Sequence, residues 1–172
     1  HMMGSQWLHT MDAEGLTPLD RAFASGHMIL AEHLLQQERA DRDGQHSTPL
    51  HRAASLGLQA AVQCLLNSGA DPAALDENGE TPLHKAARGR HRVAAAVLVD
   101  RCDVNTVNHD GMTALHYACI AGDTELVAVL RASGADPWIR NEFMDGLSAV
   151  DMAMVMGHDE IAESLGAQAA FV

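Results

Sequence analysis

One seven-residue pattern returns along the chain at an almost constant interval. It starts with Thr, is followed in its best copies by Pro-Leu-His, and ends in small residues. Its three clear copies begin at Thr48, Thr81 and Thr113, which are 33 and 32 positions apart. A period in this range is typical of small supersecondary units that stack in a row, because none of them can bury its apolar face alone. The spacing therefore predicts an extended array of repeats.

Two weaker copies extend the pattern towards both ends of the chain. They begin at Thr17 and Ser148, and in both an aspartate, Asp20 or Asp151, replaces the histidine. In four copies a glycine follows nine positions after the initial Thr or Ser, and a second apolar segment comes after it. The third copy has its glycine one place early and is one residue short at an unknown place in 88–102.

Each unit is expected to form a helix, a tight turn, a second helix and an extended loop. Thr is a good N-cap, and Pro suits the first helical position because its missing N–H would be unpaired there. Gly57 can supply the positive φ of the turn between the helices, and Gly69 can end the second helix.

These motifs resemble the ankyrin repeat family, whose signature is T-P-L-H-x-A. The resemblance implies an all-α ankyrin-repeat solenoid of about five helix-turn-helix repeats, with β-hairpin finger loops and a cap at each end. Its array is expected over 12–168, after a cloning remnant and N-terminal extension (1–11) and before a C-terminal tail (169–172). The approximate repeats are 12–43, 44–75, 76–107, 108–140 and 141–168.

Composition narrows the environment and the partners. The net charge of −12 over 172 residues argues against binding nucleic acid or an anionic membrane by charge attraction and favours a basic or neutral partner. Three cysteines without a C-x-x-C pair indicate buried thiols in a reducing compartment, the cytoplasm or the nucleus. No apolar run reaches membrane-spanning length, and no signal peptide is recognisable. We expect a monomer.

The sequence contains no recognisable catalytic or metal-binding motif. Eleven histidines invite a metal hypothesis, yet H-E-x-x-H and Cys/His ligand pairs are absent, as are phosphate loops and nucleophile elbows. His51, His84 and His116 belong to the repeated pattern and are expected to be structural, bonded to backbone groups. We therefore expect no cofactor and no enzyme activity.

The resemblance places partners on the exposed side of the first helices and on the fingers. Just after the histidine position, the five repeats carry Arg21, Arg52, Lys85, Tyr117 and Met152. Further along each helix they carry Ala24, Ser55, Arg88, Ile120 and Val155. This column changes from cationic to apolar, which predicts a groove for a peptide with an acidic part and an apolar anchor. Alternatively, the arginine and lysine side chains are solvated, with their aliphatic parts lying along alanine surfaces, and Met152 and Val155 pack within the cap.

The finger loops add further candidates for partner contact. Those at or near the fingertips are Glu77, Asn78, Asp110 and Met112, within an acidic rim that also includes Glu14, Glu80, Glu142 and Asp145. The finger after the fourth copy is two residues longer. Its Trp138 is expected to pack under the finger, with partner contact as the alternative, whereas Phe143 and Met144 are candidates for partner contact.

The resemblance also suggests a modification and a function. Asp103-Val104-Asn105 looks like the finger sequence that asparaginyl hydroxylases modify in related repeats, with Asn105 as the acceptor. The expected function is a non-catalytic protein–protein interaction module, an adaptor or scaffold. Alternatives are a docking or regulatory fragment of a larger enzyme, channel or transcription regulator, and an inhibitor that blocks a partner enzyme.

Overall fold

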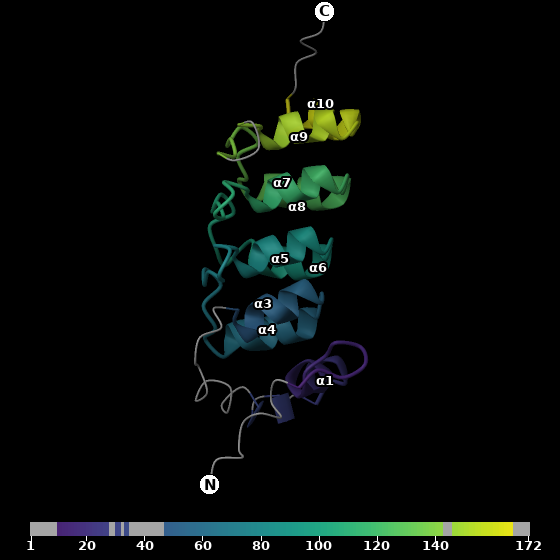
Figure 1. Ribbon diagram of the computed structural model, residues 1–172, viewed down its shortest axis with the longest axis vertical. Coiled ribbons are helices and arrows are strands. Elements are labelled where there is room, and N and C mark those ends of the chain that lie inside the picture. The colour runs from purple at the N-terminus through teal and green to yellow at the C-terminus, as the bar shows by residue number, and fades with distance from the viewer. Residues whose placement is uncertain (1–9, 28–29, 32, 35–46, 143–145, 167–172) are drawn as a thin grey trace, which may run out of the picture.

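The chain forms a stack of helix pairs with loops along one edge (Figure 1). The structure is a computed structural model that describes residues 10–27, 30–31, 33–34, 47–142 and 146–166. Its described helices are α1 (Pro18–Ala24), α3 (Pro49–Ser55), α4 (Gln59–Asn67), α5 (Pro82–Arg88), α6 (Arg92–Leu98), α7 (Ala114–Ile120), α8 (Thr124–Ala132), α9 (Ala149–Val155) and α10 (Asp159–Ser164). From α3 onward, each first helix packs on the first helix of the next repeat. The predicted all-α solenoid is confirmed.

A capping box starts the first helix of every repeat. Thr81 has an extended backbone, and its backbone N–H donates to His84 Nδ1 at 3.0 Å while its hydroxyl faces the His84 backbone N–H. Asp20 and Asp151 keep this arrangement in the terminal repeats, because their carboxylates accept from the backbone N–H of Thr17 and Ser148. Aspartate thus preserves the cap where histidine is missing.

The histidine also connects each repeat to the next. Because Nδ1 accepts a backbone hydrogen bond, the neutral ring carries its proton on Nε2 and donates from there. His51 Nε2 lies 2.9 Å from the carbonyl oxygen of Glu80, and His84 Nε2 lies 3.0 Å from that of Met112. Backbone satisfaction is therefore confirmed for His51 and His84.

His116 departs from this expectation. It is fully buried, yet its Nε2 has no hydrogen-bond partner among the described residues. The next finger is the longer one, and its Leu147 carbonyl oxygen accepts from the Asn141 backbone N–H at 3.0 Å. The lengthened finger thus closes on itself without the bond from histidine that the two preceding fingers receive.

The third repeat is shortened in its second helix and not in the turn between its helices. Gly57 has φ 68°, and Arg90 occupies the equivalent ninth position of the third repeat with φ 60°. The turn is therefore complete, although a non-glycine residue adopts the left-handed conformation. The second helix is the shortened part: α6 has 7 residues, whereas α4 and α8 have 9 each.

The fingers are closed by side-chain-nucleated turns. Asp76 Oδ1 accepts from the backbone N–H groups of Asn78 and Glu80, both at 2.9 Å. Within the described residues, the bridge between Arg140 and Ser148 is the only β-type pairing. The expected β-hairpins are thus reduced to tight turns, since an Asx turn satisfies the backbone groups that a longer ladder would otherwise pair.

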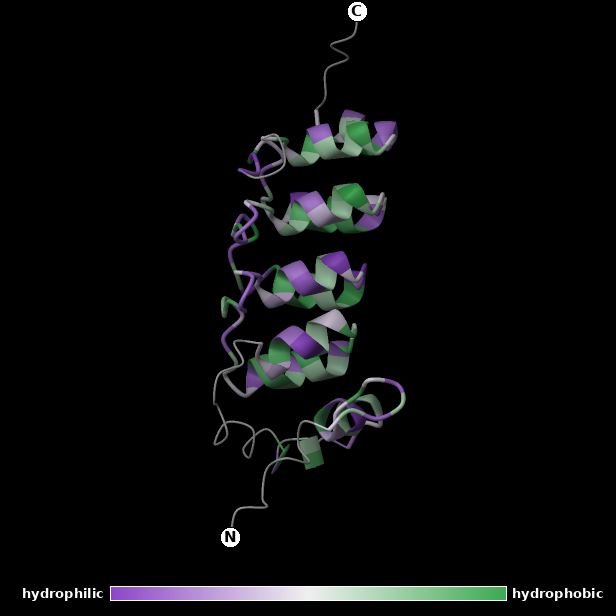
Figure 2. Cartoon of the chain, viewed as in Figure 1, coloured by the Kyte–Doolittle hydropathy of each residue, from purple (hydrophilic) through white to green (hydrophobic). Residues whose placement is uncertain are grey.

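Leucine and alanine fill the space between the repeats. Leu50, Leu83 and Leu115 are buried, and each first helix adds small residues such as Ala53 and Ala86 that are also buried. Small residues let neighbouring helices approach closely. Figure 2 shows hydrophobic and hydrophilic residues interleaved along each helix, as expected for helices that bury one side.

The buried histidines predict a loss of stability in mild acid. Burial lowers the pKa of His51, His84 and His116 below the ordinary 6.5, so the unfolded chain takes up protons at a higher pH than the folded chain. The free energy of unfolding is therefore fully present above about pH 6.5 and falls as the pH drops through the folded-state pKa values. Thermal unfolding followed by circular dichroism should show a lower Tm at about pH 5.8 than at about pH 7.5. The variant His84→Gln should narrow this gap, and an unchanged Tm in the wild type would contradict the expectation.

Two glycines with positive φ allow packing to be separated from backbone strain. A Cβ on Gly57 would lie 2.4 Å from His91 Nδ1, whereas a Cβ on Gly69 would meet nothing within 4 Å. Gly69→Ala should lower the free energy of unfolding by about 1–2 kcal/mol through strain. Gly57→Ala should cost roughly 1–3 kcal/mol more through the clash. Urea denaturation of both variants tests this, and His91→Ala should restore most of the difference.

Candidate interaction surface

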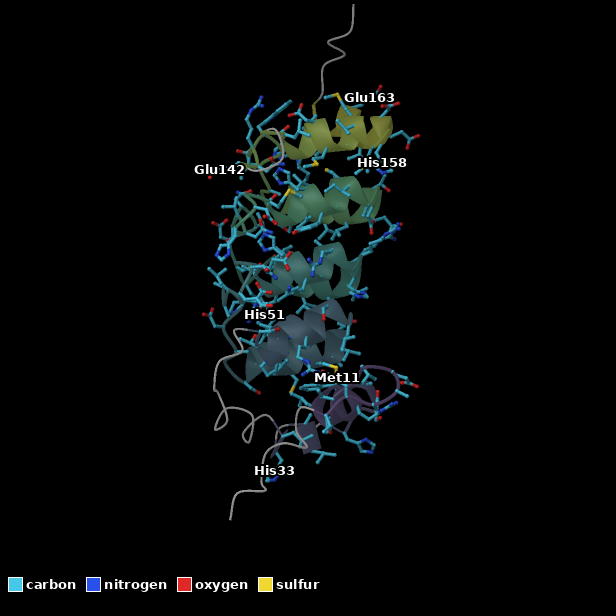
Figure 3. The ribbon with its side chains drawn as sticks, in the orientation of Figure 1. Met11, His33, His51, Glu142, His158 and Glu163 are labelled. Carbon is cyan, nitrogen blue, oxygen red and sulfur yellow. The ribbon has the colours of Figure 1, made fainter. Side chains whose placement is uncertain are left out.

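One side of the first helices carries the predicted partner-binding positions, a set that we call the lateral column. It consists of the residues four and seven positions after each N-cap: Arg21, Ala24, Arg52, Ser55, Lys85, Arg88, Tyr117, Ile120, Met152 and Val155. Because α3 packs on α5, α5 on α7 and α7 on α9, equivalent positions of these repeats lie side by side. The fingers lie along one edge of the stack, where Figure 3 shows Glu142, and the turns with His158 lie along the other.

The cations of the first two repeats are paired within the chain. Arg21 forms ion pairs with Asp12 and with Glu14, the latter at 3.2 Å. Arg52 reaches across to the preceding repeat and pairs with the buried Asp20, the residue that replaces the repeat histidine. The Asp20 carboxylate therefore both caps α1 and neutralises the next repeat's cation.

A buried carboxylate, Glu80, organises the middle of the lateral column. Its side chain is 1% exposed and receives Lys85 Nζ at 2.5 Å and Arg88 Nη1 at 3.3 Å. The Tyr117 hydroxyl donates to it at 2.8 Å and accepts from Asn108 Nδ2 at 3.0 Å. This set, which we call the Glu80 network, joins the third repeat to the fourth.

With Asp76 added, the Glu80 network is balanced in charge at neutral pH, because two carboxylates then face Lys85 and Arg88. Burial alone would raise the pKa of Glu80, but the hydrogen bonds from Lys85 and Tyr117 hold it below the usual value. Lys85 also lies 2.6 Å from Asp76, and these two carboxylates keep its pKa raised despite burial. Burial, followed by the bond to Glu80, raises the pKa of Tyr117 to about 12. An acidic partner segment would have to compete with these internal bonds.

Three expected surface residues lie inside the protein. Glu80, placed on the acidic rim by sequence, is buried because its carboxylate serves the network described above. Met112 is buried in the core beneath the fingers, where its sulfur lies 3.7 Å from Asn141 Nδ2. Met152 is buried in α9, because an apolar side chain at this position folds inward in the last repeat. The expectation that these residues offer contact surface is corrected.

Other candidates do lie on the surface. Glu77, Asn78 and Asp110 are exposed at the fingertips. Trp138, expected to pack under its finger, is 54% exposed, so the packing prediction is wrong for this residue. Phe143 and Met144 lie outside the described residues. Sequence reasoning missed Met156, although it directly follows Met154 and Val155 in an uninterrupted apolar run beside a turn glycine.

Asn105 is engaged at both ends of its amide. Nδ2 donates to the Gly134 carbonyl oxygen at 3.2 Å, and Oδ1 accepts from the Asp136 backbone N–H at 2.7 Å. The side chain thus ties one loop to the corresponding loop of the next repeat. Its modification stays a prediction.

The described residues contain no group of three potential ligands placed to hold a metal ion. Burial raises the pKa of the Cys119 thiol to about 12 and, with Asp103 adding to the effect, that of Cys102 to about 11, so neither is an activated nucleophile. Among the helices described, none is long and apolar enough to cross a membrane.

Removing the charge of Glu80 should destabilise the fold, because Lys85 and Arg88 lose a carboxylate that neutralises them. We expect Glu80→Gln to lower the free energy of unfolding by roughly 2–4 kcal/mol, because it leaves cations near a buried site without their counter-charge. The loss should be clearly smaller when Lys85→Met is already present. Urea denaturation of the four members of this cycle measures the coupling, and additive effects would refute the network.

Comparison with known proteins agrees with this architecture. A family model described as "Ankyrin repeats (3 copies)" matches residues 3–76, 60–141 and 101–171. Human B-cell lymphoma 3 protein is 35% identical over 136 residues, which is 73% of this chain and 30% of that protein. Human Rabankyrin-5 is 39% identical over 109 residues, or 61% of this chain and 9% of that protein.

Human NF-kappa-B inhibitor alpha is 28% identical over 143 residues, covering 76% of this chain and 45% of that protein. The chain thus spans less than half the length of each of these relatives. Stacked helix pairs, the histidine link between repeats and the matching family model agree with one another, and ankyrin repeats are protein-interaction modules. The chain belongs to the ankyrin-repeat family.

Proposed function

We propose that this chain is a non-catalytic adaptor or scaffold that binds a protein or peptide on the lateral column and the fingers. It acts as a monomer in the cytoplasm or nucleus and needs no cofactor. The observation that carries this proposal is the fixed placement of exposed side chains along the stack. Surfaces that are ordered before binding lose less conformational entropy when a partner arrives.

Hydrogen bonds between repeats support this fixed placement. His51 and His84 donate to carbonyl groups of the following fingers. The backbone N–H of His109 donates to the Asn78 carbonyl oxygen at 3.0 Å, which fixes one fingertip against the next. The fingertips therefore hold Glu77 and Asp110 at a set spacing along the edge of the stack.

The exposed charge on the fingers supports a basic or neutral partner. Neither Glu77 nor Asp110 takes part in an ion pair among the described residues, whereas Arg52 and Lys85 are paired internally. Unpaired acids can meet a partner's cations without first losing an internal bond.

A capture experiment tests the proposed function. Immobilised chain is compared with Glu77→Gln/Asp110→Asn and with Gln59→Lys/Gln63→Lys, a control that makes the net charge more positive by the same amount but changes α4 outside the fingers. At least one captured protein should be retained by the wild type and the control and lost, by about tenfold or more, with the fingertip variant. Identical capture by all three, or capture by none, would contradict binding through the fingers.

An inhibitor is the second candidate. The similarity to NF-kappa-B inhibitor alpha favours testing whether a captured enzyme loses activity when the chain is added. If the enzyme's turnover is unchanged in the complex, the inhibitor proposal is wrong and the adaptor proposal stands.

A further inference from the structure

The last two repeats carry aliphatic side chains at or just after the last residue of their first helices, where among the first three repeats only Leu56 is a large apolar residue. Ile120 is partly buried, whereas Val155 and Met156 are 71% and 50% exposed. We call these three residues the α9 patch. Ile120 and Val155 occupy the seventh position of neighbouring repeats, and α7 packs directly on α9. At that position the second and third repeats carry Ser55 and Arg88, so an apolar surface here is not a requirement of the scaffold.

The exposure of Val155 and Met156 is not a consequence of lying in the last repeat. Ser55, Leu56 and Arg88 hold the equivalent seventh and eighth positions of inner repeats and are also exposed, although another repeat follows them. Met154 is different. Its counterparts Ala54 and Ala87 are fully buried against the next repeat. Met154 thus belongs to the end of the stack, whereas Val155 and Met156 belong to its side.

The part of the sequence that carries Val155 and Met156 is acidic. From residue 141 to residue 166 the sequence has six acidic residues and no lysine or arginine. Asp159 and Glu160 lie three and four positions after Met156, are exposed, and form no ion pair within the described part of the chain. In the first three repeats, by contrast, each cation of the lateral column has an internal carboxylate partner.

We propose that the α9 patch is the docking site for a basic amphipathic segment of a partner protein. The segment's aliphatic side chains cover Val155, Met156 and Ile120, and its lysine or arginine side chains lie towards Asp159 and Glu160. Burial of the exposed aliphatic surface supplies the driving force, and the unpaired carboxylates select cationic over anionic segments. This inference rests on the proposed function, since it names the partner's chemistry at one part of the same surface.

The test uses two synthetic peptides and the full chain. Each peptide has about 14 residues and carries leucine at helical spacing, with lysine at the other positions in one and glutamate in the second. Fluorescence anisotropy gives the Kd of each fluorescein-labelled peptide. The leucine–lysine peptide should bind, and the leucine–glutamate peptide should bind at least about tenfold more weakly.

Two variants separate apolar docking from charge attraction alone. Val155→Ser/Met156→Ser should weaken binding of the leucine–lysine peptide at least about tenfold, and Asp159→Lys/Glu160→Lys should weaken it to a similar degree. The control Leu75→Ser/Val93→Ser removes the same number of exposed aliphatic side chains elsewhere and should leave the Kd within about twofold. Since all six side chains are exposed, far-ultraviolet circular dichroism should show unchanged folding.

Three results would overturn the proposal: no binding of the leucine–lysine peptide, equal binding of both peptides, or the same affinity in Val155→Ser/Met156→Ser as in the wild type. The last result would identify general charge attraction. None of them affects capture through Glu77 and Asp110, so the docking site can fail while the proposed function stands. Conversely, if the peptide binds at the α9 patch but capture does not depend on the fingertips, binding through the fingers is wrong and the docking site at the α9 patch stands.

Discussion

The architecture depends on the imidazole ring of the repeat histidine, which makes two hydrogen bonds, one within its own repeat and one to the next. In the second and third repeats, a backbone N–H at the start of the first helix donates to Nδ1, which places the proton on Nε2 and directs it to a carbonyl group of the following finger. Helix initiation and repeat-to-repeat attachment therefore share a side chain. Because thin helix pairs bury little surface alone, this coupling gives each unit the register of its neighbour.

Carboxylates take over part of this role where the histidine is missing or where cations gather. Asp20 caps α1 and also binds Arg52 of the next repeat. Glu80 holds Lys85, Arg88 and Tyr117 together. The cationic half of the lateral column is consequently a structural feature that links repeats, and the surface available to a partner shifts towards the fingertips and the last two repeats.

Sequence predicted the stack because its signals are local. Thr48, Thr81 and the turn glycine Gly57 act through hydrogen bonds and backbone angles within a few residues, so their spacing was enough to predict the helices. The surface was harder to predict. Whether Glu80 faces solvent depends on Lys85 and Tyr117, and Tyr117 lies 37 positions away and comes from another repeat. The inward turn of Met152 and the exposure of Trp138 likewise depend on tertiary packing, which no short motif encodes.

The Nε2 of His116, unpaired within the described part of the chain, makes one junction of the stack chemically different from the two before it. At the junction of the fourth and fifth repeats, the described residues lack the cross-repeat bond that ties the second to the third and the third to the fourth. A buried donor left without an acceptor opposes tight closure of that junction. The final helix pair is thus joined to the fourth repeat without this bond, by the packing of α9 on α7, so its attachment relies on buried apolar side chains such as Val150 and Ile161.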